Sequence, residues 1–208
     1  MNTLAFGNQK PDKICPAVEE KLRKELGAAA PLPYQVEDQS SQTTSVGTVF
    51  KDMTHALFSG KTQELFRINF DLSAPRKAQL QAYVMRQGVG AHVGLLLYST
   101  TLAKAAAGEA TLENPKMFGT SKFTGDASVT GKLNANGDLL KQLGKFARTQ
   151  AEIGGMTVTI PRLAKVTPQD GAALLVIGTL PRMTSMGMDA SLDAKDFFDL
   201  ANLIEKVL

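Results

Sequence analysis

Two aspartates are the residues of this chain best suited to acid and base chemistry. Asp71 and Asp189 each stand in an Asp-x-Ser motif that ends a stretch of alternating apolar and polar residues. Two carboxylates can divide the acid and base roles of a reaction when their environments differ. An Asp or Ser side chain can also cap the first turn of a following helix. We favour the capping role, so a small enzyme with a carboxylate-based site is only the second alternative.

The other residues with reactive or metal-binding side chains are isolated in the sequence. No set of His and carboxylate residues completes a metal site around His55 or His92. Cys15 is the only cysteine, which excludes an intramolecular disulfide. Tyr98 has no dinucleotide fingerprint before it, and the glycine-rich stretch 88–94 precedes an apolar run instead of opening a helix. We expect no metal, no cofactor and no catalytic residue.

Charge is spread unevenly along the chain. The whole sequence carries a net charge of +3, from 23 Lys and Arg against 20 Asp and Glu. Residues 116–182 carry a net +5, whereas residues 183–208 carry a net −3. Lys141, Lys145 and Arg148 lie on the polar face of a predicted helix within the basic stretch. An acidic C-terminal helix of one copy could therefore pair with the basic stretch of another copy.

These features favour a non-enzymatic interaction or assembly module, an adaptor or structural protein. We expect it to form a homo-oligomer or to bridge protein partners. A run of methionines near the C-terminus supports this role, because methionine adapts to varied surfaces. The candidate interaction residues are Lys141, Lys145, Arg148, Met183, Met186 and Met188.

Nucleic-acid binding is the first alternative function. The basic region 116–182 would bind a single strand if Phe118 and Phe123 were exposed as a stacking platform. The chain has few aromatic residues and no tryptophan, so buried phenylalanines are the stronger expectation. A polar surface with buried phenylalanines would disfavour this alternative.

The alternation of apolar residues predicts an α+β fold with a mixed, largely antiparallel sheet and helices packed on one face. Apolar residues spaced at three and four predict helices, and period-two alternation or continuous apolar runs predict strands. The predicted helices span 16–26, 46–58, a segment following Asp71, 103–110, 138–153 and 193–207. The predicted strands span 65–72, 91–101, 156–166, 172–180 and 183–190, with hairpin strands within 116–136.

The sequence also predicts a division of the chain. Residues 1–45 form an N-terminal helix with a flexible, polar arm, and residues 46–208 form the α+β core domain. The Asp-x-Ser motifs recur at an offset of 118 residues, which would make two related strand-helix units in halves 46–113 and 114–208.

The N-terminal residues lack the basic start and apolar run of a signal peptide, and no window is apolar enough for a membrane helix. We expect a soluble cytoplasmic protein without a membrane span. Had a leader been removed, an exported form or one lipid-anchored at Cys15 would be the alternative.

Overall fold

The computed structural model describes most of the second half of the chain and parts of the first. The described residues are 16, 20–25, 34–38, 62–71, 77–87, 91–113, 120–153, 156–179 and 194–208. Two predicted elements, the helix over 46–58 and the strand over 183–190, lie outside these residues. Outside them too are Cys15, His55, Phe118, Met183, Met186, Met188 and Asp189.

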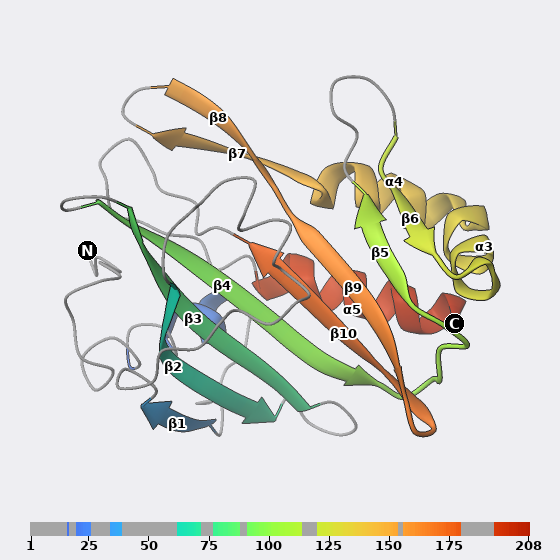
Figure 1. The fold of residues 1–208 in the computed structure, drawn as a ribbon, viewed down its shortest axis with the longest axis horizontal. Coiled ribbons are helices and arrows are strands. Elements are labelled where there is room, and N and C mark those ends of the chain that lie inside the picture. The colour runs from blue at the N-terminus through green and yellow to red at the C-terminus, as the bar shows by residue number, and fades with distance from the viewer. Residues whose placement is uncertain are drawn as a thin grey trace.

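The centre of the fold is an eight-stranded sheet in which all neighbouring strands are antiparallel (Figure 1). Its strand order is β1-β2-β3-β4-β10-β9-β5-β6. A separate two-stranded ribbon of β7 and β8 extends from one end of the sheet. The sheet strands are β1 (Tyr34–Asp38), β2 (Thr62–Asp71), β3 (Lys77–Gln87), β4 (Ala91–Leu102), β5 (Ala110–Glu113), β6 (Lys122–Gly125), β9 (Leu163–Gln169) and β10 (Ala172–Thr179). The ribbon strands are β7 (Arg148–Ile153) and β8 (Met156–Pro161).

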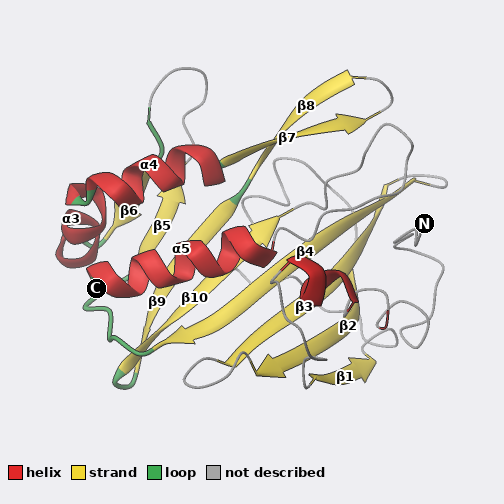
Figure 2. Cartoon of the chain, turned by 180° about the vertical axis from the view of Figure 1, so that it is seen from behind, coloured by secondary structure: helices red, strands yellow, loops and turns green. Residues whose placement is uncertain are grey.

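The helices α3 (Ala127–Ala135), α4 (Gly137–Phe146) and α5 (Ala194–Val207) lie together on one face of the sheet (Figure 2). The strands send alternate residues towards them, as in the row Leu80, Tyr98 and Ile177, whose backbones pair across β3, β4 and β10. All of these side chains are buried, as are Phe197 and Ile204 on α5. The predicted α+β class, with a largely antiparallel sheet and helices on one face, is confirmed.

Several predicted elements appear where the sequence placed them. The alternating stretch before Asp71 forms β2, and the apolar runs form β4 and β10. β10 is a central strand, as its continuous apolar sequence indicated. β9 and β10 are joined at Asp170 and Gly171, where Gly171 has φ of +69°. A positive φ is what a tight hairpin turn requires, and glycine adopts it without steric cost.

The helix predicted after Asp71 is wrong, because residues 77–87 form strand β3. Buried Ala78 and Leu80 alternate with the half-buried Gln79 and Gln81, which is the period of a strand. Gln79 Nε2 also donates to Asn69 Oδ1 across the strands, at 2.6 Å. Asp71 therefore ends a strand that is followed by another strand. The first of the two proposed strand-helix units is therefore wrong, and the strand of the second, residues 183–190, lies outside the described residues.

Three further local predictions are wrong. Residues 103–109 are not helical, and in the described part of the predicted hairpin, 120–136, the short strand β6 is followed by helix α3. The helix predicted over 138–153 ends at Phe146, and the following residues form β7 paired with β8. The β-branched residues Thr149 and Ile153 suit this ribbon better than a helix. Arg148 is therefore on β7 and does not share a helix with Lys141 and Lys145.

Asparagine side chains fix both helices of this region. Asn136 Oδ1 accepts a hydrogen bond from Leu139 N at 2.9 Å and so caps α4. Asn134, on α3, bonds both backbone groups of Phe123, donating to its O at 2.7 Å and accepting from its N at 2.9 Å. β6 is the last strand of the sheet, so Asn134 occupies hydrogen-bonding groups that an edge strand would otherwise present to another chain.

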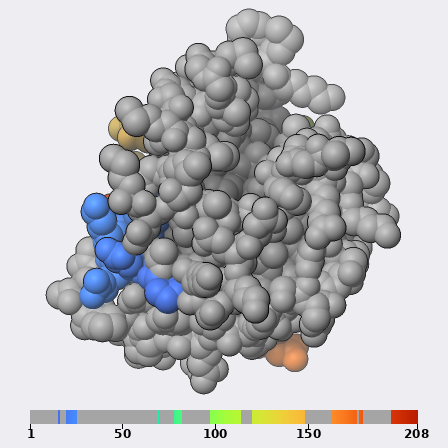
Figure 3. Space-filling model, turned by 90° about the vertical axis from the view of Figure 1, so that its left-hand side faces the viewer, coloured from blue at the N-terminus to red at the C-terminus, as the bar shows by residue number. Residues whose placement is uncertain are grey.

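The N-terminal segment is joined to the sheet and to α5. Residues 20–25 are helical, Leu22 is 1% exposed within the hydrophobic core, and β1 pairs with β2. Glu25 Oε2 accepts from Ala194 N at 2.8 Å, at the first residue of α5. Figure 3 shows residues 20–25 in blue on the surface of the molecule. The division into an arm of residues 1–45 and a core domain stays a prediction.

One glycine is required by the packing of two loops. Gly125 has φ of +131°, and a Cβ there would lie 2.4 Å from Glu109 O. We expect Gly125→Ala to lower the free energy of unfolding by about 1–3 kcal/mol, because the new methyl group meets backbone that cannot move alone. Gly131→Ala is the matched control, since a Cβ there meets nothing within 4 Å and helix α3 favours alanine by about 0.5–1 kcal/mol. Urea unfolding of both variants checks the pair, and equal stability of the two would contradict the expectation.

Candidate functional site

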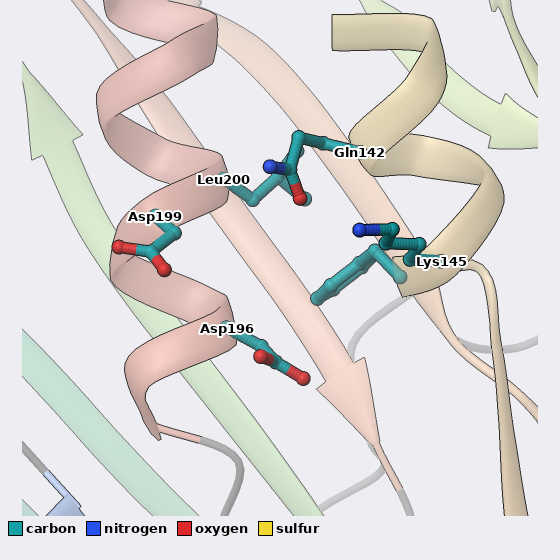
Figure 4. Close-up of a pocket in the computed structure, with 6 residues that line it drawn as sticks. Gln142, Lys145, Asp196, Asp199 and Leu200 are labelled. Carbon is teal, nitrogen blue, oxygen red and sulfur yellow. The ribbon is translucent and has the colours of Figure 1, made fainter. Parts of the chain in front are cut away.

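A pocket opens between α4 and α5 on the helical side of the molecule. The cavity has a volume of about 90 Å³ and is open to solvent. Lys145 extends from α4 on one side, while Asp196 and Asp199 extend from α5 on the other (Figure 4). Its lining residues are Gln142, Lys145, Phe146, Asp196, Asp199 and Leu200.

A buried arginine lies next to this pocket. Arg162 stands between β8 and β9, where the chain passes from the ribbon into the main sheet. Its Nη1 donates to Asp196 Oδ2 at 3.0 Å, and its guanidinium carbon lies 4.9 Å from the centre of the Phe146 ring. The Arg162 side chain is 1% exposed, whereas that of Asp196 is 49% exposed. The arginine thus ties α5 and the end of α4 to the junction of the two sheets, helped by its backbone N–H, which donates to Ala147 O at 3.1 Å.

At this pocket α4 presents lysine side chains and α5 presents aspartates, while Asp138 is also exposed on α4 and Lys195 and Lys206 on α5. Lys141 and Lys145 are exposed on α4, and in the part of the chain that the structure describes neither forms an ion pair. Asp196 and Asp199 are exposed on α5. We call the exposed side chains of Lys141, Gln142, Lys145, Asp196 and Asp199 the α4–α5 face. It offers an amide, ammonium groups and carboxylates for ion pairs and hydrogen bonds with another surface.

One of these carboxylates has a local partner. Lys195 donates a hydrogen bond to Asp199, one turn further along α5. This hydrogen bond and the charge of Asp199 raise the pKa of Lys195 above its usual value. Both side chains are exposed, so Asp199 stays accessible to a second cation.

The structure separates the candidate catalytic residues of the sequence. Asp71 pairs with Lys77 and His92 pairs with Arg86, at opposite ends of β3. The nine residue-to-residue steps of strand from Lys77 to Arg86 amount to about 30 Å. Tyr98 is buried in the core, its ring stacked on Phe197 with 4.8 Å between the ring centres. Asp71 and His92 therefore stand at distant places in the sheet, and His92 lies in the strand predicted over 91–101. Asp189, the proposed partner of Asp71, lies outside the described residues.

The candidate interaction residues that the structure describes lie on two different elements. Lys141 and Lys145 are exposed neighbours on α4, while Arg148 stands at the start of β7. Phe123, one of the two phenylalanines of the stacking platform, is buried in the core. A platform that includes an exposed Phe123 is therefore wrong.

Arg162 was not among the functional residues predicted from the sequence. A signal was present, because Arg162 shares the even-numbered positions of Ala164 and Val166, which all face inward. A charged residue in the inward register of a strand indicates a buried ion pair, here with Asp196.

Comparisons with models of protein families, with curated proteins and with solved structures found no match. No helix among the described residues is long and apolar enough to cross a membrane. Within the described ranges, no group of three or more His, Cys, Asp or Glu side chains is arranged to hold a metal ion.

Proposed function

We propose that this protein is a non-enzymatic interaction module that binds a protein partner through the α4–α5 face. The observation that carries the proposal is an open pocket lined by Lys145 from α4 and by Asp196 and Asp199 from α5. The apolar sides of both helices are already used in the core, through residues such as Leu143 and Phe197. Their charged sides are therefore free of any part in the hydrophobic core.

The arrangement of charge favours a protein over a nucleic acid as the partner. Asp196 and Asp199 stand across the pocket from Lys145, so a phosphate backbone approaching α4 would meet carboxylates on α5. Repulsion of this kind opposes the counterion release that drives nucleic-acid binding. A protein surface can instead present both signs of charge and satisfy both walls.

A site-specific photo-cross-link tests the proposal. We expect p-benzoylphenylalanine in place of the exposed Gln142 to cross-link the protein to a partner, either in its source lysate or in a second copy of the chain. Gln169, exposed at the end of β9, is the matched control position and should give no such product. Equal cross-linking from both positions, or none from Gln142 in lysate and in pure protein, would contradict the proposal.

A further inference from the structure

We infer that the partner on the α4–α5 face is a second copy of this chain, related by a two-fold axis that runs along the groove between α4 and α5. This inference rests on the proposed function and names the partner of the same site. A two-fold interface uses the same surface on both copies, so that surface must complement itself. The α4–α5 face has exposed lysines on α4 and exposed aspartates on α5, each aspartate with a cationic neighbour in its own chain, and a lysine of one copy can meet an aspartate of the other.

The positions of the charges determine which residues can meet. Lys145 of α4 and Asp199 of α5 line the same pocket (Figure 4). Rotation about an axis along the groove places α4 of one copy over α5 of the other. Lys145 of each copy then faces Asp199 of the other, and the contact forms twice.

Asp199 is better placed than Asp196 to bind the second copy. Asp196 already accepts from Arg162, and its loss would disturb the junction of the two sheets. Asp199 contacts only the exposed Lys195 among the ion pairs of the described residues, and it remains open to solvent. We therefore assign the intermolecular contact to Lys145 and Asp199, in a polar interface weakened by salt.

Charge reversal provides the test. We expect the wild-type protein to sediment as a concentration-dependent dimer at low ionic strength. Lys145→Glu and Asp199→Lys should each raise the dimer dissociation constant by about a hundredfold, because each places two like-charge pairs in the interface. Lys122→Glu on β6 and Asp170→Lys in the β9–β10 turn are exposed, matched controls and should leave the constant unchanged.

A mixture of Lys145→Glu and Asp199→Lys tests whether residue 145 of one copy contacts residue 199 of the other. In an equimolar mixture, Glu at 145 of one chain faces Lys at 199 of the other, and the unaltered Asp199 and Lys145 face each other. We expect dimers to return in the mixture, as heterodimers, although each variant alone is a monomer. Failure of the mixture to dimerise would overturn the inference even if both single variants dissociate.

Two other outcomes separate the inference from the proposed function. A dimer that persists in Lys145→Glu would overturn the two-fold arrangement and leave self-association at another surface. A wild-type protein that stays monomeric at every concentration would also overturn it. A cross-link from Gln142 to a different protein would in that case still support the interaction module.

Discussion

Truncation of Phe197 to alanine is expected to lower the free energy of unfolding by about 3–5 kcal/mol, the usual cost of removing a buried aromatic side chain. Phe197 is 1% exposed and lies where α5 meets the sheet. Its ring stacks on Tyr98 of β4 and meets the edge of Phe198, with 4.8 Å and 4.6 Å between the ring centres. The substitution removes both contacts and leaves a cavity between the helix layer and the sheet.

Urea denaturation followed by circular dichroism measures this change. Leu203→Ala on the same helix is the control, because Leu203 is only partly buried against the core. We expect the control to lose far less stability, with the same dependence on urea concentration in both variants. Equal losses from the two truncations would show that α5 does not pack on the sheet through Phe197.

Asp196→Ala is expected to destabilise the protein by about 2–3 kcal/mol, more than Arg162→Met at about 1 kcal/mol. Removal of the aspartate leaves the buried Arg162 guanidinium without the carboxylate 3.0 Å away. The cost stays below that of a fully buried pair, since the Asp196 side chain is half exposed and water screens the interaction. Methionine at position 162 replaces the cation with an apolar chain of similar length and leaves Asp196 in contact with water.

The double variant Arg162→Met with Asp196→Ala separates the loss of the ion pair from other effects of each substitution. In the Arg162→Met background, Asp196→Ala should cost almost nothing, because there is no buried charge left to compensate. The coupling between the two positions, measured from four urea-unfolding curves, should therefore be close to the whole effect of Asp196→Ala. Additive effects of the two substitutions would mean that Asp196 does not neutralise Arg162.

Long elements with a strong period were predictable from the sequence. β2 and β4 follow clear alternation or apolar runs, and α5 follows apolar residues at three- and four-residue spacing. β3 was missed because Asp71 and Pro75 resemble the start of a helix. Local capping signals were outweighed by pairing with β2 and β4 on both sides.

The short elements between β5 and β7 depend on contacts that the sequence does not show. The stretch with Thr and Gly before Asn134 resembles hairpin material, yet the Asn134 side chain bonds the β6 backbone from a helix. Helix α4 ends at Phe146, where the Arg162 guanidinium packs over the ring from another part of the chain. Both arrangements are tertiary, so composition and period could not reveal them.

The candidate site was predictable in part. The uneven charge pointed to Lys141 and Lys145, which are exposed on α4. The sequence did not show that α4 and α5 lie side by side within the same chain, with Lys145 and Asp199 lining one pocket. Because the two helices are neighbours, their lysines and aspartates lie on one face. The same face on a second copy can therefore pair with it.

An intermolecular distance measured by pulsed electron paramagnetic resonance tests the two-fold α4–α5 interface most directly. A nitroxide attached at Gln142→Cys in a Cys15→Ser background labels the centre of the α4–α5 face. We expect a defined distance between labels on two copies, lost when Lys145→Glu is added, and a longer or undefined one for a label at Gln169→Cys. Labels at residue 142 that show no dipolar coupling in a dimeric sample would contradict the two-fold interface.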